Sequence, residues 1–371
     1  MDIKDTLRPE TLSYTPYSPG LSIDEIKERY GLATVIKLAS NENPLGASPQ
    51  VVRALERKAA SVFRYPQSGN PRLVEAIARF HGVGRECVVP GNGSDEIIDL
   101  LIRVKARPGI DNVAAFDPSF SIYRLQSRLC GVSMRTAPLP ADFSFPFEEL
   151  LKLCDENTAL VFVTNPDNPS GYAVKADAIV SLARRLPPRA LLVVDEAYVE
   201  FALPEEEYSV LGRLSELPNV AVLRTFSKLY GLAGVRLGFG VMPAWLADIL
   251  MRVRLPFSVS LAAEAAGLAA LQDTAFRQAS LEAVATGRAF LFKELSRLSC
   301  RPRPSQANFL LFTPPVAAEK VFQDLLAKGI IIRPLSSYGL PDDLRVSIGS
   351  AQENRAFINA LHDALTADVR A

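Results

Sequence analysis

The chain has 371 residues, and 48% of them are hydrophobic, which is enough for a full core and more than one domain. Its 41 basic and 41 acidic residues cancel, so the charge indicates neither a nucleic acid nor an anionic membrane surface as a partner. No membrane span or secretion signal is expected, and four widely spaced cysteines indicate reduced thiols in a cytoplasmic protein without a metal site.

The first 45 residues are predicted to form an N-terminal arm that belongs to a smaller domain, and residues 46–265 a large α/β domain. Short apolar runs in the large domain alternate with amphipathic segments of helical length. Continuous apolar strands of this kind are typical of a largely parallel sheet covered by helices on both faces. The expected strands are residues 112–116, 159–164, 190–195 and 220–225, and one expected helix is 175–188.

The pattern changes after residue 265. A long helical stretch leads into the apolar run 307–312, and a helix over 317–329, two short strands and a last helix follow. Helices and strands mixed in this way predict a smaller α+β domain over residues 266–371.

Three of the expected strands end in polar clusters. The clusters contain Asn168 beyond 159–164, Asp195 and Tyr198 at and after the end of 190–195, and Thr225, Ser227 and Lys228 at and after the end of 220–225. Ligands in open α/β sheets bind beyond the carboxyl ends of the strands, so three clusters on adjacent strands would surround one pocket. Taken singly, each cluster has a simpler interpretation as a turn, a helix cap or a solvated loop.

The combination of these groups is suited to pyridoxal phosphate. A carboxylate at the end of a buried strand needs a cationic partner, and burial near Arg236 would shift the Lys228 amine towards its neutral, nucleophilic form. The cofactor requires a lysine for its aldehyde, an acid for its pyridinium nitrogen and donors for its phosphate. A dinucleotide is the rival interpretation, but the glycines at 238–240 do not extend to the G-x-G-x-x-G pattern.

The stretch GNGSDE, residues 91–96, is the expected phosphate site. Its glycines allow the backbone to approach an anion closely, and Ser94 and Asp95 open an expected helix whose N-terminal N–H groups attract anions. An ordinary capped helix would explain the stretch equally well by itself. Together with Ser227 and Arg236, the phosphate interpretation is stronger.

Motifs along nearly the whole chain match one family in that family's own order. They are LASNENPLG (38–46), RYP (64–66), GNGSDE (91–96), TNPDNPSG (164–171), VDEAYVEF (194–201), TFSKLYGLAGVRLGFG (225–240), PSQANFLLF (304–312), and GIIIRPLSSYGL with LRVSIG (329–349). On these residues the chain resembles the fold-type I, pyridoxal-phosphate-dependent aminotransferases, and among them those that act on histidinol phosphate. The resemblance implies amino-group transfer between a small-molecule amino donor and a 2-oxo acid acceptor.

The resemblance also implies the residues around the cofactor ring. Lys228 would bind the cofactor covalently and carry protons, and Asp195 would pair with the pyridine nitrogen. Asn168 and Tyr198 would hydrogen-bond the ring hydroxyl. Phe120 would stack on the ring, at a position where many relatives have tyrosine.

A further implication of the resemblance concerns the cofactor phosphate and the assembly. The expected phosphate ligands are Gly93, Ser94, Asp95, Thr225, Ser227 and Arg236. Tyr65 would reach the phosphate of the neighbouring subunit, which implies a homodimer with shared active sites.

For the substrate, the resemblance assigns Arg345 to an α-carboxylate, Arg333 and Tyr17 to the distal phosphate of histidinol phosphate, and Asn168 to substrate contacts. The expected reaction is amino transfer between L-histidinol phosphate and 2-oxoglutarate, in histidine biosynthesis. Two alternatives remain open, an aminotransferase of aromatic amino acids and a decarboxylase of a phosphorylated amino acid like that of cobalamin biosynthesis. Two segments near the substrate depart from the family pattern, PFSVS (256–260) and RYPQSGNPRL (64–73).

Overall fold

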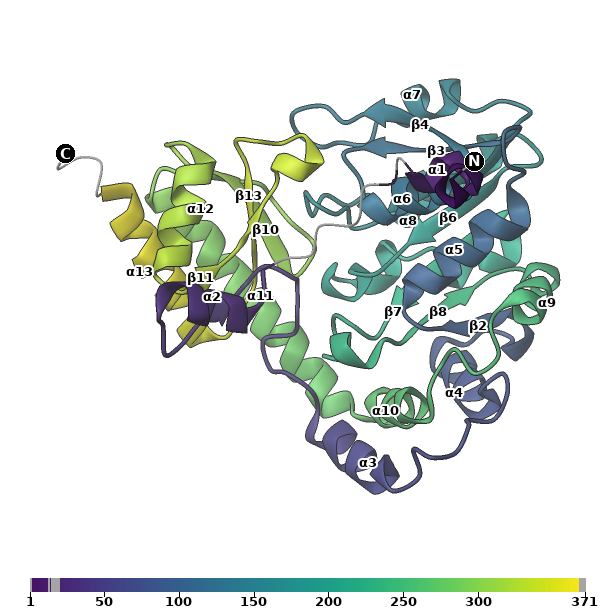
Figure 1. Ribbon diagram of the computed structural model, residues 1–371, viewed down its shortest axis with the longest axis horizontal. Coiled ribbons are helices and arrows are strands. Elements are labelled where there is room, and N and C mark those ends of the chain that lie inside the picture. Colours follow the sequence, from purple (N-terminus) through teal and green to yellow (C-terminus); the bar gives the residue numbers. More distant parts are fainter. Residues whose placement is uncertain (1, 13, 15–20, 367–371) are drawn as a thin grey trace.

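A computed structural model describes residues 2–12, 14 and 21–366, and Figure 1 shows its arrangement. Its largest sheet has seven strands in the order β2-β8-β7-β6-β5-β3-β4. The strands from β3 to β7 run parallel, and β8 runs antiparallel to both of its neighbours. The predicted α/β class with a mostly parallel sheet is confirmed. The strands are β2 (Val88–Gly91), β3 (Asn112–Asp117), β4 (Ser133–Pro138), β5 (Thr158–Thr164), β6 (Leu191–Asp195), β7 (Val220–Thr225) and β8 (Gly238–Val241).

Side chains of the central strands alternate between two cores on opposite faces of the sheet. In β6, Leu192 and Val194 belong to one core, whereas Leu191 and Val193 belong to the other. Every residue of β5, β6 and β7 is therefore buried. Burial on both faces explains why these strands are unbroken apolar runs and why the sequence pattern located them.

Helices cover both faces of this sheet (Figure 1). The first core contains residues of α4, α8 and α10, and the second contains residues of α5 and α9. The helices of this part are α3 (Pro49–Ala59), α4 (Pro71–His81), α5 (Ser94–Lys105), α6 (Ser121–Leu129), α7 (Phe147–Lys152), α8 (Ala176–Arg185), α9 (Ala244–Val253) and α10 (Leu261–Gln272).

The C-terminal part is built on a smaller antiparallel sheet of order β12-β13-β10-β9. The strand β1 pairs in parallel with β11 and so attaches an N-terminal segment to this part. The elements are β1 (Ile36–Lys37), β9 (Arg301–Pro302), β10 (Phe309–Thr313), β11 (Ile330–Ile331), β12 (Arg333–Pro334), β13 (Leu344–Ser347), α2 (Ile23–Tyr30), α11 (Thr274–Arg297), α12 (Ala318–Ala327) and α13 (Ala351–Thr366).

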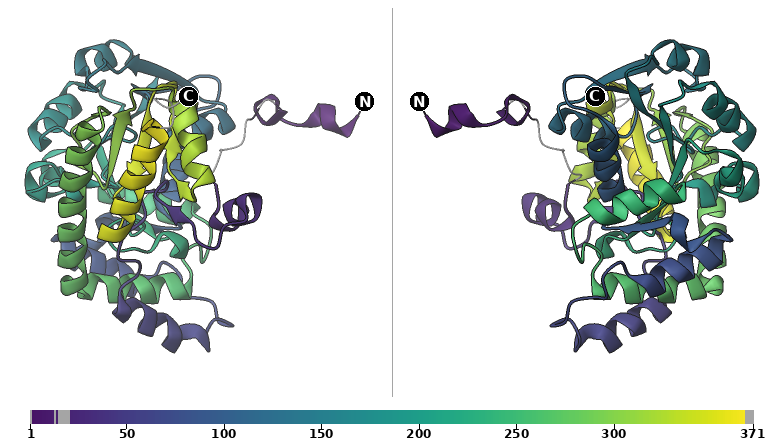
Figure 2. Two further views of the ribbon diagram at one scale, coloured as in Figure 1. Left: turned by 90° about the vertical axis from the view of Figure 1, so that its left-hand side faces the viewer. Right: turned by 90° about the vertical axis from the view of Figure 1, so that its right-hand side faces the viewer.

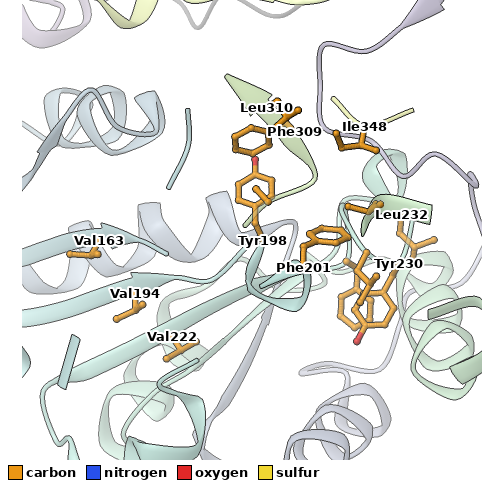
Figure 3. Close-up of a cluster of buried hydrophobic side chains, with 14 of the residues drawn as sticks. Val163, Val194, Tyr198, Phe201, Val222, Tyr230, Leu232, Phe309, Leu310 and Ile348 are labelled. Atoms are coloured by element: carbon orange, nitrogen blue, oxygen red, sulfur yellow. The ribbon is translucent and has the colours of Figure 1, made fainter. Parts of the chain in front are cut away.

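One core continues from the large sheet into the C-terminal part. Figure 3 shows Val163, Val194 and Val222 on the central strands and, beyond them, the ring of Tyr198 pointing at Phe309. The two rings meet edge to face with centroids 5.1 Å apart. Because this packing holds the two sheets together, residues from both can be placed accurately around one site.

The N-terminal segment extends away from the rest of the molecule in Figure 2. It contains a 3₁₀ turn (Ile3–Thr6) and α1 (Pro9–Leu12), and the Arg8 side chain donates to the carbonyl of Leu129 at 2.9 Å. The predicted boundary after residue 265 falls within α10, and the division into domains stays a prediction. Among the described helices, none is long and apolar enough to cross a membrane.

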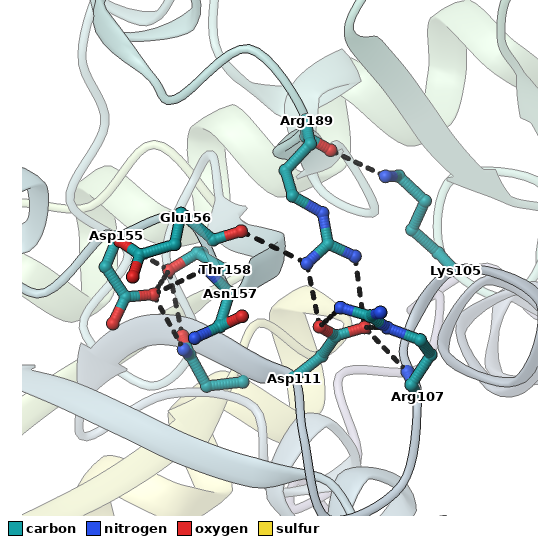
Figure 4. Close-up of polar contacts among 9 residues, drawn as sticks. Lys105, Arg107, Asp111, Asp155, Glu156, Asn157, Thr158 and Arg189 are labelled. Atoms are coloured by element: carbon teal, nitrogen blue, oxygen red, sulfur yellow. Dashed lines mark hydrogen bonds and ion pairs between the residues drawn. The ribbon is translucent and has the colours of Figure 1, made fainter.

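A polar cluster lies at the amino ends of β3 and β5, the edge of the sheet opposite to the carboxyl ends of these parallel strands (Figure 4). The buried carboxylate of Asp111 accepts hydrogen bonds from Arg107 Nη2 at 2.8 Å and Arg189 Nη1 at 2.7 Å. These two guanidinium groups hold the pKa of Asp111 well below its usual range. The cluster therefore stabilises the sheet edge.

Candidate active site

A cavity of about 250 Å³ lies at the carboxyl ends of β5, β6 and β7. These strands are neighbours in the sheet, so their polar ends meet, as the sequence predicts. Ten of the residues proposed from the sequence line the cavity, namely Ser94, Asp95, Phe120, Asn168, Asp195, Tyr198, Thr225, Ser227, Lys228 and Arg236. Ser40, Glu42, Thr164, Ala197 and Ala233 complete the lining.

Lys228 lies just beyond the end of β7 with its amine in the cavity. Its Nζ donates a hydrogen bond to the carbonyl of Ser40 at 3.0 Å and lies 5.7 Å from the ring centroid of Tyr198. The pKa of Lys228 is lowered to about 8, mainly by burial and then by the positive charge of Arg345. Near pH 7 a larger fraction of this amine is therefore uncharged than in an ordinary lysine. The uncharged amine is the form that attacks a carbonyl carbon.

Asp195 ends β6 and is buried, with only 3% of its surface exposed. It accepts hydrogen bonds from the Tyr123 hydroxyl at 2.9 Å and the Ala197 N–H at 3.1 Å. Burial raises its pKa to about 6. Within the described part of the chain, no cationic side chain pairs with it, so it is ready to accept a proton-bearing cationic group of a ligand.

The N-terminus of α5 forms a cradle for an anion. Gly93 precedes the helix with a φ of 75°, and a Cβ added there would lie 2.5 Å from Arg236 Nη2, so only glycine fits. Arg236 also approaches Ser227 Oγ at 3.4 Å and Asp95 Oδ2 at 3.3 Å. The free N–H groups at the start of a helix, a guanidinium and a hydroxyl together suit a phosphate group.

The opposite wall of the cavity contains Tyr198, Asn168 and Phe120. The Tyr198 hydroxyl accepts a hydrogen bond from Asn41 Nδ2 at 3.2 Å, and burial raises its pKa. Asn168 Oδ1 accepts a short hydrogen bond from Arg345 Nη1. These contacts fix the positions of a phenol and an amide in the lining of the cavity.

Four proposed residues lie outside the cavity lining. Arg345 is buried behind Asn168, and Arg333 stands directly opposite it in the register of β12 and β13. Tyr65 is 81% exposed and its ring stacks on Phe257 with centroids 4.7 Å apart. Gly93 directly precedes α5, and its backbone forms part of the cradle. Tyr17, the remaining proposed residue, lies outside the residues that the structure describes.

Three polar residues near the cavity are not predicted from the sequence. Tyr123 donates to Asp195, Asn41 donates to Tyr198, and Glu42 lines the cavity beside Lys228. Asn41 and Glu42 belong to the motif LASNENPLG, and Tyr123 to the segment FDPSFSIY around Phe120. Asn41 and Glu42 lie in a motif that carries the family resemblance, and Tyr123 lies three residues after Phe120, but no local pattern indicates which of these side chains reach the site.

The residues present fit pyridoxal phosphate. Asp195 offers a buried carboxylate that lacks a cation among the described residues, and a pyridinium nitrogen would supply one. Lys228 offers an amine with a lowered pKa on the other side of the cavity. The α5 cradle with Ser227 and Arg236 offers donors for the phosphate. All three requirements of the cofactor are met within one cavity.

Comparisons with known proteins point to the same chemistry. Residues 33–361 match the family model of aminotransferase class I and II. The chain is 58% identical over 365 residues to histidinol-phosphate aminotransferase of Nitratidesulfovibrio vulgaris strain Hildenborough, with 98% of both chains covered. It is 59% identical over 356 residues to the enzyme of that name from Oleidesulfovibrio alaskensis, covering 95% of this chain and 93% of the relative.

A solved structure is similar over almost the whole chain. It is the crystal structure of histidinol-phosphate aminotransferase from Sinorhizobium meliloti in complex with pyridoxal 5'-phosphate. The TM-score is 0.89, with 26% sequence identity and coverage of 97% of this chain and 98% of that one.

Proposed function

The chain belongs to the class I and II aminotransferases and depends on pyridoxal phosphate, and from this premise we propose that it transfers an amino group between L-histidinol phosphate and 2-oxoglutarate. The names of the relatives that are 58% and 59% identical over nearly the full length support this choice of substrate. The finer assignments below belong to the same proposal.

The observation that carries the proposal is the pair of arginines on the neighbouring strands β12 and β13. Arg345 is 5% exposed, its Nε has no hydrogen-bond partner, and no carboxylate of the described residues lies within ion-pair distance of it. A buried cation of this kind is costly unless a ligand supplies the anion. Arg333 lies on the same face of the sheet as Arg345, because the two residues are directly opposite in an antiparallel pair. Two guanidinium groups suit a substrate pair that presents a carboxylate in one half-reaction and a phosphate in the other.

In this assignment Arg345 binds the α-carboxylate of glutamate, and Arg333 binds the phosphate of histidinol phosphate. The hydrogen bond between Arg345 and Asn168 orients the guanidinium and links it to the cofactor end of the cavity. Tyr17 is assigned to the same phosphate from the family resemblance.

When bound, pyridoxal phosphate supplies an electron-withdrawing ring that makes the Cα–H bond of the attached substrate acidic. Lys228 is the attachment residue, and its Nζ removes and returns the Cα proton as a general base and acid. A pKa of about 8 lets this amine hold and release a proton near neutral pH. Asp195 stabilises positive charge at the ring nitrogen, and the hydrogen bond from Tyr123 keeps its carboxylate oriented.

The remaining cavity residues position the cofactor. Asn168 and Tyr198 bind the ring hydroxyl, and Phe120 covers one face of the ring. The phosphate is held by the start of α5 at Gly93, Ser94 and Asp95, and by Thr225, Ser227 and Arg236.

The enzyme is proposed to act as a homodimer with shared active sites. Exposed apolar side chains gather on two segments, at Val62 (67%), Phe63 (74%) and Tyr65 (81%) and at Leu255 (73%), and the stacking of Tyr65 on Phe257 joins the two segments. Exposed apolar surface of this extent supports burial against a second copy. Tyr65 would then contact the cofactor phosphate of the partner subunit.

A cytoplasmic location is part of the same proposal. All four cysteines are free thiols, which suits a reducing compartment.

Two measurements test the proposal. Reduction of the purified protein with borohydride and peptide mapping should find the cofactor on Lys228, and modification of another lysine would refute that role. A panel of amino donors scored by conversion of the cofactor to its pyridoxamine form should rank histidinol phosphate first. A preference for phenylalanine or tyrosine would favour the aromatic aminotransferase, and release of CO₂ from a phosphorylated amino acid would favour the decarboxylase.

A further inference from the structure

The loop from Asn41 to Asn43 holds Glu42 in a fixed position at the cavity. Asn41 is 2% exposed, has a φ of 55°, and donates to the Tyr198 hydroxyl at 3.2 Å. Asn43 donates from its side chain to the carbonyl of Leu229 at 2.7 Å. Since both neighbours of Glu42 are bound to residues around the site, the loop has little freedom, and the Glu42 side chain is presented to the cavity that it lines.

Glu42 differs from the other two acidic side chains of the cavity. Asp195 accepts two hydrogen bonds, and Asp95 pairs with Arg236 at 3.3 Å. In Glu42, Oε1 accepts from Lys37 Nζ at 3.0 Å, whereas Oε2 has no partner among the described residues. The Glu42 side chain is 44% exposed, which places it at the rim of the cavity. It therefore has one acceptor atom available to a substrate.

The carboxylate also lies within electrostatic reach of the reacting amine. Burial lowers the pKa of Lys228, and among the charges that oppose this effect Glu42 acts most strongly. Lys228 and Glu42 are further connected through the hydrogen bond from the lysine to the carbonyl of Ser40, two residues before Glu42. A substrate bound at Lys228 would occupy the cavity that Glu42 also lines.

We propose that Glu42 selects the amino donor by accepting a hydrogen bond from the N–H group of its imidazole ring. The inference rests on the proposed function and names a residue that determines its specificity. An imidazole always carries an N–H donor and is partly cationic near neutral pH. A phenyl ring of similar size has no donor, so it would cover Oε2 and remove its water without replacing the hydrogen bond. A site built to accept a hydrogen bond rejects a ligand that lacks the donor, and this rejection separates imidazole donors from aromatic amino acids.

The test compares three amino donors, histidinol phosphate, histidine and phenylalanine, with the cofactor-loaded enzyme in single-turnover reactions. Glu42→Ala should lower kcat/KM for histidinol phosphate and histidine roughly 10- to 150-fold, the effect of losing a hydrogen bond to a charged group. Its kcat/KM for phenylalanine should change by less than about threefold, because no hydrogen bond is lost there. Glu42→Gln keeps an acceptor without the charge, so its kcat/KM for histidinol phosphate and histidine should lie between those of the wild type and Glu42→Ala. If Glu42→Ala does not fold, Glu42→Gln alone provides the test.

A matched control separates recognition from a structural role of the ion pair. Lys37→Met breaks the pair but leaves the Glu42 carboxylate in place, and it should keep the wild-type preference for histidine over phenylalanine. Equal losses for histidine and phenylalanine in the Glu42 variants would overturn the inference, and so would loss of the preference in Lys37→Met. If the wild type does not use histidinol phosphate, the proposed function fails. The histidine-to-phenylalanine ratio then still decides the role of Glu42.

Discussion

Replacing Arg224 by methionine should destabilise the protein strongly, because this arginine holds three carboxylates together inside it. Arg224 is 1% exposed on β7. It forms ion pairs with Glu196 at 2.8 Å, Glu200 at 3.3 Å and Glu205 at 2.9 Å. Methionine keeps an unbranched apolar stem but lacks the guanidinium group, so the substitution removes the charge and all three ion pairs.

The magnitude follows from what is left behind. Glu196 and Glu200 would remain buried without a cation, whereas Glu205 keeps its ion pair with Arg277 at 2.9 Å. Removing one partner of a buried ion pair costs about 3–5 kcal/mol, because the remaining charge is uncompensated. We expect the free energy of unfolding to fall by about 4 kcal/mol at about pH 8, above the raised pKa of Glu200 in the wild type.

The loss should shrink at lower pH. Burial raises the pKa of Glu200 to about 7, against an ordinary value of 4.5. A group with a raised folded-state pKa binds more protons when folded, so its contribution to stability is present below pH 4.5 and is lost as the pH rises through 7. Without Arg224 the pKa values of Glu196 and Glu200 would rise further, and each added unit corresponds to about 1.4 kcal/mol. The variant should therefore recover stability, relative to the wild type, between about pH 8 and pH 5.5.

Urea unfolding followed by circular dichroism, at one protein concentration and at both pH values, measures the effect. Arg213→Met is the control, since its partners Asp177 and Glu216 are 90% and 46% exposed, and it should cost less than about 1 kcal/mol. Adding Glu200→Gln to Arg224→Met should restore part of the stability at the higher pH. A loss below about 1 kcal/mol, or one that grows on acidification, would refute the reasoning.

Three further predictions concern substrate, assembly and acid stability. Arg333→Ala should reduce kcat/KM for histidinol phosphate about 10- to 150-fold more than for an unphosphorylated aromatic donor, and equal losses for both would favour the aromatic aminotransferase. Mixing Lys228→Ala and Tyr65→Ala subunits should restore activity, because a heterodimer gathers both lesions in one site; no recovery despite measured subunit exchange would contradict the shared site. Asp111→Asn should cost about 1–3 kcal/mol near neutral pH by urea unfolding, the effect of losing hydrogen bonds to a charged group. Because the folded-state pKa of Asp111 is depressed, its contribution is present above its unfolded pKa near 4, and the difference from the wild type should fade, not grow, as the pH falls below this value.

The strands of the large sheet and ten of the residues that line the candidate site can be predicted from the sequence. A strand that is buried on both faces needs apolar residues along its whole length. The apolar runs of β5, β6 and β7 in the sequence therefore predict these strands. Parallel strands place their carboxyl ends at one edge, so Asp195 and Lys228 had to lie close together once their strands were neighbours. The role of Gly93 before α5 can also be predicted from the sequence, because its positive φ is a local backbone conformation that favours glycine.

Contacts between residues far apart in the sequence complete the site, and these depend on the packing of the whole chain. Arg345 bonds to Asn168 across 177 residues of sequence, Tyr123 reaches Asp195 from α6, and Glu42 enters the cavity from a loop near the N-terminus. None of these contacts repeats with the period of a strand or a helix, so no local pattern records it. The Tyr123 contact depends on the packing of α6 against the large sheet, where the Tyr123 ring stacks on Phe162. The Arg345 contact depends on the continuous core around Tyr198 and Phe309, which fixes the small sheet against the large one and so sets the distances between side chains on the two parts.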